Sequence, residues 1–109
     1  MGEPGFCVAA NLQELPPGRS CRVLVDGRGV LLCNVGGEVY AVADVCTHDR
    51  GPLGEGRVRG YTVECPRHGA RFDVRNGSVK AKPALRPIET FPVRLDDDRV
   101  LVAVPGKPS

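Results

Sequence analysis

Two short pairs of metal-binding residue types constrain this chain more than any other feature of its sequence. Cys46 and His48 form the first pair, and Cys65 and His68 form the second after sixteen intervening residues. Each pair offers one thiolate and one imidazole, the ligand types that suit zinc, copper and iron-sulfur centres. The chain has only two histidines, and both follow a cysteine within three residues. The sequence therefore predicts one metal site built from both pairs.

Two other interpretations of this pattern stay open. The pairs could have fallen into register by chance, as two buried cysteines and two histidines of surface loops. They could also form a structural zinc site with two cysteines and two histidines, because zinc binds these ligands readily. Zinc-binding pairs usually leave two to four residues between ligands, whereas only one residue separates Cys46 from His48. The spacing therefore counts against zinc.

The rest of the chain predicts an all-β fold. Short runs of β-branched and aliphatic residues alternate with turn residues, and no long segment has the period of a helix. Asn76-Gly77 is the strongest short hairpin signal in the chain. The predicted strands lie at residues 22–25, 30–33 and 39–42, which hairpin turns join, and at residues 71–74, 78–80, 91–95 and 100–104.

A segment of another kind, residues 44–68, separates the early strands from the Asn76-Gly77 hairpin. It is rich in glycine, proline and charge, and it contains both histidines. Loops of this kind often carry function. The length is near the usual size of one domain, so we expect a single domain over residues 1–109. Three other cysteines lie in strand-like runs and are expected to be small buried residues without a ligand role: Cys7, Cys21 and Cys33.

Composition and charge argue against several classes of function. The formal net charge is +2, and lysine and arginine are scattered among acidic residues. Nucleic-acid-binding proteins instead show a basic stripe with interleaved aromatic residues. No apolar run approaches the length that spans a bilayer, and the N-terminus lacks the regions of a signal peptide. We therefore expect a cytoplasmic protein that binds neither nucleic acid nor membranes.

The motif around the two pairs resembles a known family. The pattern C-x-H-x16-C-x2-H, followed by residues 69–73, is similar to the Rieske signature of bacterial ring-hydroxylating dioxygenase ferredoxins. Residues 37–42 resemble the strand that approaches the first pair, residues 51–53 the first cluster loop, and residues 91–93 the closing strands. The resemblance covers nearly the whole chain.

This resemblance implies an all-β fold, a Rieske-type antiparallel β-sandwich with a small inserted cluster-binding subdomain. The two cluster-binding loops are expected at about residues 44–55 and 63–73. Residues 82–87 resemble a proline-bearing loop that covers the cluster from a third side, at about residues 80–88. Within it, Pro83 and Leu85 are expected to be cover residues.

The resemblance also implies one [2Fe-2S] cluster per chain. Carried over by position, Cys46 and Cys65 bind one iron, and His48 and His68 bind the other. Neutral imidazoles leave the cluster less negative than four thiolates would, so that it accepts an electron more readily. Rieske centres accordingly span about −150 to +300 mV, against about −400 mV for plant-type ferredoxins.

Departures from the respiratory members of the family predict a potential at the low end of that range. Those relatives place a serine hydroxyl two residues after the second histidine and a tyrosine two residues further on, where this chain has Ala70 and Phe72. They also join their loops by a disulfide at the places of Gly51 and Arg67. Hydrogen bonds donated to the sulfurs stabilise the reduced cluster. Their loss therefore lowers the potential.

The function implied is that of a one-electron carrier, which takes electrons from a flavin-dependent reductase and passes them to a terminal oxygenase. The chain is not expected to be an enzyme, because no histidines remain for a mononuclear iron site. Two alternatives remain: a small Rieske-like subunit of an assimilatory nitrite reductase, and a zinc-stabilised interaction module. A monomer is the simplest expectation for a shuttle.

The partners are expected to dock at the tip that carries His48 and His68. Basic residues outnumber acidic ones around this tip, which favours an acidic partner surface. A solvated face of mixed charge is the alternative. The basic residues are Arg50, Arg67, Arg71, Lys80, Lys82 and Arg86, and the acidic ones are Asp44, Asp49 and Glu55.

Overall fold

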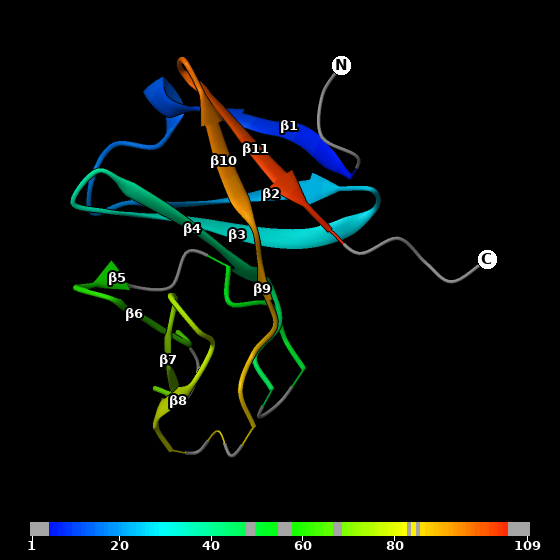
Figure 1. The fold of residues 1–109 in the computed structure, drawn as a ribbon. Helices are drawn as coiled ribbons and strands as arrows, with labels where there is room; N and C mark the ends of the chain where they lie inside the picture. The colour runs from blue at the N-terminus through cyan, green and yellow to red at the C-terminus, as the bar shows by residue number, and fades with distance from the viewer. Residues whose placement is uncertain are drawn as a thin grey trace.

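The structure is a computed structural model that describes residues 5–47, 50–54, 58–66, 69–82, 84 and 86–104. Over these residues the chain forms three antiparallel sheets and one short 3-10 helix, so the all-β prediction is confirmed. Figure 1 shows two of the sheets packed together and the third at one end of the molecule. No described helix is long and apolar enough to cross a membrane.

The first sheet joins the two ends of the described chain. Its strand order is β1 (Phe6–Asn11), β11 (Arg99–Ala103) and β10 (Val93–Asp96). Successive side chains of a strand point to opposite faces, and in β11 the alternate residues Val100 and Val102 are fully buried. The 3-10 helix η1 (Leu12–Glu14) follows β1 and begins at Asn11, whose side chain caps it.

The middle sheet contains the hairpin-linked strands that the sequence predicted. Its order is β2 (Ser20–Val25), β3 (Arg28–Val35), β4 (Glu38–Ala43) and β9 (Thr90–Phe91). The central strand β3 is buried on both faces, which explains why it reads as a continuous apolar run. Its residues alternate between two cores: Val30 and Leu32 face the first sheet, and Leu31 and Cys33 face the other way.

In the sequence, the strands of the third sheet lie between β4 and β9, which are neighbours in the middle sheet. Its order is β5 (Val58–Arg59), β6 (Thr62–Glu64), β7 (Arg71–Asp73) and β8 (Val79–Ala81). Fully buried residues of this sheet, Val63 and Phe72, belong to the same core as Leu31 and Cys33 of β3. This second core therefore fastens the inserted sheet to the middle sheet.

One predicted strand and one predicted hairpin differ from those observed. The run at residues 91–95 was expected to be one strand, but Pro92 divides it into β9 and β10, which belong to different sheets. Proline has no backbone N–H to donate to a ladder, so the chain changes sheets there. The hairpin at Asn76-Gly77 is present but wider than predicted. The amide of Gly77 donates to the carbonyl of Asp73 at 2.7 Å, before β8 begins.

Candidate metal centre

Both cysteines of the two predicted pairs lie in the second core. Cys46 and Cys65 are each 0% exposed. Apolar side chains, among them Leu53 and Ala84, surround them in one cluster of buried residues. His48 and His68 lie outside the described residues, so the structure presents one half of the predicted ligand set. The part of the chain that the structure describes accordingly holds no cluster of three or more potential ligands.

The first cysteine begins a loop that two backbone hydrogen bonds close. The amide of Cys46 donates to the carbonyl of Gly51 at 2.7 Å, and the amide of Arg50 donates to the carbonyl of Cys46 at 2.8 Å. Arg50 has a φ of 62°, in the left-handed region that L-residues seldom adopt. In the sequence, His48 lies inside this closed loop.

The second cysteine begins a loop with the same pattern. The amide of Cys65 donates to the carbonyl of Ala70 at 2.7 Å, and the amide of Gly69 donates to the carbonyl of Cys65 at 3.1 Å. Gly69 also has a positive φ, of 79°. His68 lies inside this loop in the sequence, as His48 does in the first. The fold thus presents two equivalent loops, each with a buried thiol at its first residue.

The base of the first loop is anchored by a buried carboxylate. Asp44 accepts a hydrogen bond from the amide of Gly54 at 2.8 Å through Oδ1. Its Oδ2 lies 2.6 Å from Nε of Arg22, and its side chain is fully buried. The amide of Asp44 donates to the carbonyl of Gly29 at 3.0 Å. Asp44 was expected among the charges of the tip, but it stands at the base of the loop, joining it to the middle sheet.

A third segment, with the described residues 84 and 86–88, packs beside the two loops. Figure 1 shows it running alongside the first loop. The hydroxyl of Thr47 donates to the carbonyl of Arg86 at 2.7 Å. The amide of Ile88 donates to the carbonyl of Gly77 at 2.9 Å, which ties the segment to the β7–β8 turn. Ala84 is buried in the core that contains both cysteines. Pro83 and Leu85 lie outside the described residues, so their role as cover residues stays a prediction.

An ion pair and two aromatic rings join the third sheet to β4. Arg75 makes two hydrogen bonds with the carboxylate of Asp73, at 3.1 and 2.8 Å. These bonds hold the pKa of Asp73 below its ordinary value. The guanidinium of Arg75 lies 4.0 Å from the centre of the Tyr61 ring, which meets the Tyr40 ring edge-on at 6.2 Å. Tyr40 and Tyr61 thus act as packing residues at this junction.

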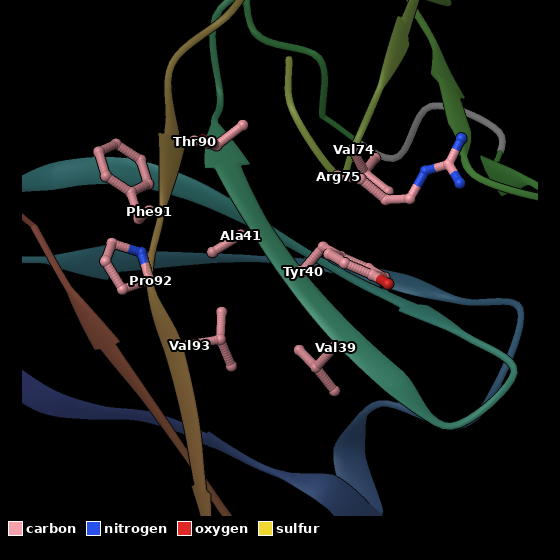
Figure 2. A pocket seen from close by; sticks show the side chains of 9 residues that line it. All are labelled: Val39, Tyr40, Ala41, Val74, Arg75, Thr90, Phe91, Pro92 and Val93. Carbon is pink, nitrogen blue, oxygen red and sulfur yellow. The ribbon is translucent and has the colours of Figure 1, made fainter.

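A hollow of about 510 Å³ opens at this junction, as Figure 2 shows. It forms where the chain passes from β9, which pairs with β4, to β10 in the first sheet, with Val74 and Arg75 of the β7–β8 turn at one end. Val39 and Ala41 of β4 form an apolar floor. None of the described residues of the two cysteine loops lines this hollow.

The donor chemistry of the two loops fits an iron-sulfur centre. Thiolates are the ligands of such clusters, and here two buried thiols stand at equivalent places in an apolar core. Buried Ala70 and Phe72 add no hydroxyl to these surroundings. No disulfide forms among the described residues, which include all five cysteines.

The three remaining cysteines lie in strands and differ from the loop pair. Cys7 and Cys21 are partly exposed in β1 and β2. Cys33 is fully buried in β3, and burial raises the pKa of its thiol to about 12. A thiol with so high a pKa stays protonated at neutral pH. Cys33 is therefore buried as predicted, whereas Cys7 and Cys21 lie in strands but are only partly buried. That none of the three is a ligand stays a prediction.

Comparisons with known proteins point to the same chemistry. The model of the Rieske [2Fe-2S] domain matches residues 5–92. The ferredoxin component of biphenyl 2,3-dioxygenase from Rhodococcus jostii (strain RHA1) is 44% identical over 93 residues, which cover 85% of this chain and 87% of that protein.

Solved structures share the whole fold. The ferredoxin of carbazole 1,9a-dioxygenase from Nocardioides aromaticivorans IC177 superposes with a TM-score of 0.86 at 35% identity, over 90% of this chain and 96% of its own. The complex of reduced oxygenase and oxidized ferredoxin in carbazole 1,9a-dioxygenase contains a chain with a TM-score of 0.87 at 30% identity, matched over 98% of this chain and 100% of that one. The putative NADH-dependent nitrite reductase small subunit from Mycobacterium tuberculosis has a TM-score of 0.82 at 25% identity, over 94% and 96% of the two chains.

Proposed function

This chain belongs to the Rieske [2Fe-2S] domain family, and we propose that it passes electrons from a flavin-dependent reductase to a terminal oxygenase. It is a one-electron carrier with a [2Fe-2S] cluster and not itself an enzyme. The observation that carries the proposal is the pair of buried thiols, Cys46 and Cys65, at equivalent places in two adjacent loops.

The cluster ligands of the proposal are Cys46 and Cys65 on one iron and His48 and His68 on the other. The group supplies reversible uptake of one electron, and the chain supplies its surroundings. The core around both cysteines is apolar and excludes water from the sulfurs. Both loops are closed by short backbone bonds, so they can hold their ligands with little rearrangement on electron transfer.

We place the potential at the low end of the Rieske range. The positions that could carry hydroxyl groups near the cluster hold Ala70 and Phe72, and both side chains are fully buried. A redox titration monitored by visible absorption measures the potential directly. A midpoint well above 0 mV would contradict this part of the proposal.

The oxygenase partner is favoured over the nitrite reductase alternative. The ferredoxin component from Rhodococcus jostii is 44% identical to this chain, whereas the putative nitrite reductase subunit is 25% identical. One similar ferredoxin is seen in a complex with its oxygenase. In this role the chain works as a cytoplasmic monomer, which shuttles between two partners and docks them at the tip that carries His48 and His68.

Spectroscopy of the purified protein tests the cluster. We expect a brown protein whose dithionite-reduced form gives a low-temperature EPR signal of low average g, typical of mixed thiolate and imidazole ligation. The variants Cys46→Ser, Cys65→Ser, His48→Ala and His68→Ala should lose this signal. The control variants Cys7→Ser and Cys21→Ser should keep it. A colourless, EPR-silent protein that contains zinc would contradict the cluster and would instead indicate a zinc-stabilised interaction module.

Reconstitution tests the partners. The purified chain is added to the reductase and oxygenase of the biphenyl dioxygenase system from Rhodococcus jostii (strain RHA1), in place of that system's ferredoxin. We expect oxidation of biphenyl that requires the chain. A cluster-bearing chain that supports no turnover would contradict the proposed acceptor.

A further inference from the structure

A small hollow beside the first cysteine loop has the properties of a docking site for an acidic side chain. Its volume is about 180 Å³, and its lining is Val45, Thr47, Arg50 and Arg86. Val45 is apolar and yet 42% exposed, immediately before Cys46. We propose that this hollow receives an Asp or Glu carboxylate of the electron-accepting protein between Arg50 and Arg86, while Val45 contacts an apolar neighbour. This inference rests on the proposed function.

The charge of the hollow supports this occupant. Within the described part of the chain, no carboxylate lies within ion-pair distance of Arg50 or Arg86, and both residues are exposed. Five other arginines each lie within that distance of a carboxylate: Arg22, Arg28, Arg71, Arg75 and Arg99. Arg50 and Arg86 therefore bring two positive charges, neither of them paired with a described carboxylate, to the same hollow.

The backbone fixes both arginines to the first loop. The amide of Arg50 donates to the carbonyl of Cys46, and the carbonyl of Arg86 accepts the hydroxyl hydrogen bond of Thr47. The two guanidinium groups thus extend from backbone positions bonded to Cys46 and to its next neighbour. A carboxylate bound there gains charge-assisted hydrogen bonds, and the fixed backbone reduces the entropy lost on docking.

A second hollow adjoins the first and differs from it in charge. Its volume is about 240 Å³, and it shares Val45 and Thr47 with the first. On this side the charge is neutralised, because Arg28 pairs with Glu89 at 2.6 Å. Arg28 also lies over the Phe91 ring, at 5.1 Å from its centre. A partner therefore meets a positive hollow on one side of Val45 and a neutral one on the other, which orients its acidic group.

The size of the hollow favours a protein side chain over a free cofactor. Sites for small molecules and cofactors usually have volumes of about 300–1,000 Å³, larger than the 180 Å³ observed. A carboxylate with its short side chain fits this volume. Complementary charge at such interfaces raises association rates by steering the partner.

Charged electron acceptors test the location of the positive field. The dithionite-reduced protein is mixed in a stopped-flow apparatus with ferricyanide, and each molecule passes one electron to one ferricyanide ion to give ferrocyanide. The test variant is Arg50→Glu with Arg86→Glu. The control is Arg19→Glu with Arg59→Glu, which makes the same change in net charge at exposed positions outside the hollow.

At low ionic strength we expect the test variant to react with ferricyanide about tenfold more slowly than the control. With the cation tris(phenanthroline)cobalt(III) as acceptor, the test variant should instead be the faster protein. The difference should vanish near 1 M salt, where the screening length is about 3 Å. Equal rates for the two variants would overturn the inference. If charge reversal prevents folding, Arg50→Gln with Arg86→Gln serves as the test variant, with a threefold effect expected.

The oxygenase of the Rhodococcus jostii biphenyl system tests the occupant. We expect the test variant to raise the KM for the carrier at least tenfold, with kcat and the EPR spectrum unchanged. A variant that loses reactivity with ferricyanide but keeps the wild-type KM would overturn docking by a carboxylate. Absence of the Rieske EPR signal from the wild-type protein would instead refute the proposed function, so the two failures are distinguishable.

Discussion

The buried carboxylate of Asp44 accepts a hydrogen bond at 2.8 Å from the amide of Gly54, ten residues further along the chain. This bond joins the two ends of the first cysteine loop. The other oxygen of the carboxylate lies 2.6 Å from Nε of Arg22 in β2, so the middle sheet holds the base of the loop in place. The position of Cys46 therefore depends on a residue that is not one of the proposed ligands.

Replacement of Asp44 tests this anchor. In Asp44→Ala the Gly54 amide loses its acceptor, and we expect the free energy of unfolding to fall by about 1–3 kcal/mol. Asp44→Asn keeps a carbonyl oxygen for that amide and should cost less. Urea denaturation followed by circular dichroism measures both values. If Asn is as costly as Ala, the hydrogen bond to Gly54 is not what holds the loop.

Gly77 is a point where the fold leaves no room for a side chain. Its φ is 79°, and an added Cβ would lie 2.0 Å from the carbonyl oxygen of Ile88. We expect Gly77→Ala to cost more than about 2 kcal/mol, because backbone must move in addition to the left-handed strain. Gly60→Ala is the control, since Gly60 has a φ of 54° with open space around it. The control should lose about 1 kcal/mol in the same denaturation experiment. Equal losses would mean that the Ile88 contact yields easily.

Arg50 occupies the place in the first loop that Gly69 occupies in the second, and both have positive φ. An L-residue in this conformation costs about 1–2 kcal/mol relative to glycine. We therefore expect Arg50→Gly to be more stable than Arg50→Gln by about 1 kcal/mol, although both variants lose the same charge. Thermal unfolding of the two variants decides the question. If Arg50→Gly is less stable than Arg50→Gln, the backbone at residue 50 is not strained.

The two cysteine loops could be singled out from the sequence because residue type carries that information. Cysteine and histidine in close pairs have few other uses, so Cys46 and Cys65 stand out without any structure. The ligand spacing does not indicate that the two loops are equivalent. One residue separates Cys46 from His48, whereas two residues separate Cys65 from His68. The backbone bonds nevertheless close both loops at the same offset from the cysteine.

Elements that depend on distant residues could not be predicted in this way. The strands β5 and β6 have only two and three residues, too few to show a period. The family resemblance places Arg50 and Arg86 around the same tip, but the hollow that they line with Val45 and Thr47 appears only in the folded chain. Asp44 was assigned to the tip on its sequence position alone, because burial and the contact with Arg22 appear only in the folded chain.

The thiol of Cys33 links the stability of the second core to pH. Burial raises its pKa from 9.0 to about 12, so above pH 9 the folded protein keeps a proton that the unfolded chain releases. The contribution of this thiol to stability is therefore complete below pH 9 and is lost as the pH rises toward 12, by about 1.4 kcal/mol per pH unit.

Cys33→Ala removes this titration and leaves every other group in place. Between pH 8 and pH 10.5 we expect the free energy of unfolding of the wild-type protein to fall by about 2 kcal/mol more than that of the variant. At pH 8 the variant should be the less stable protein, because truncating a buried side chain leaves a small cavity. The two proteins should therefore approach each other in stability as the pH rises. Parallel losses in urea denaturation across this range would show that Cys33 ionises as easily in the folded core as in the unfolded chain.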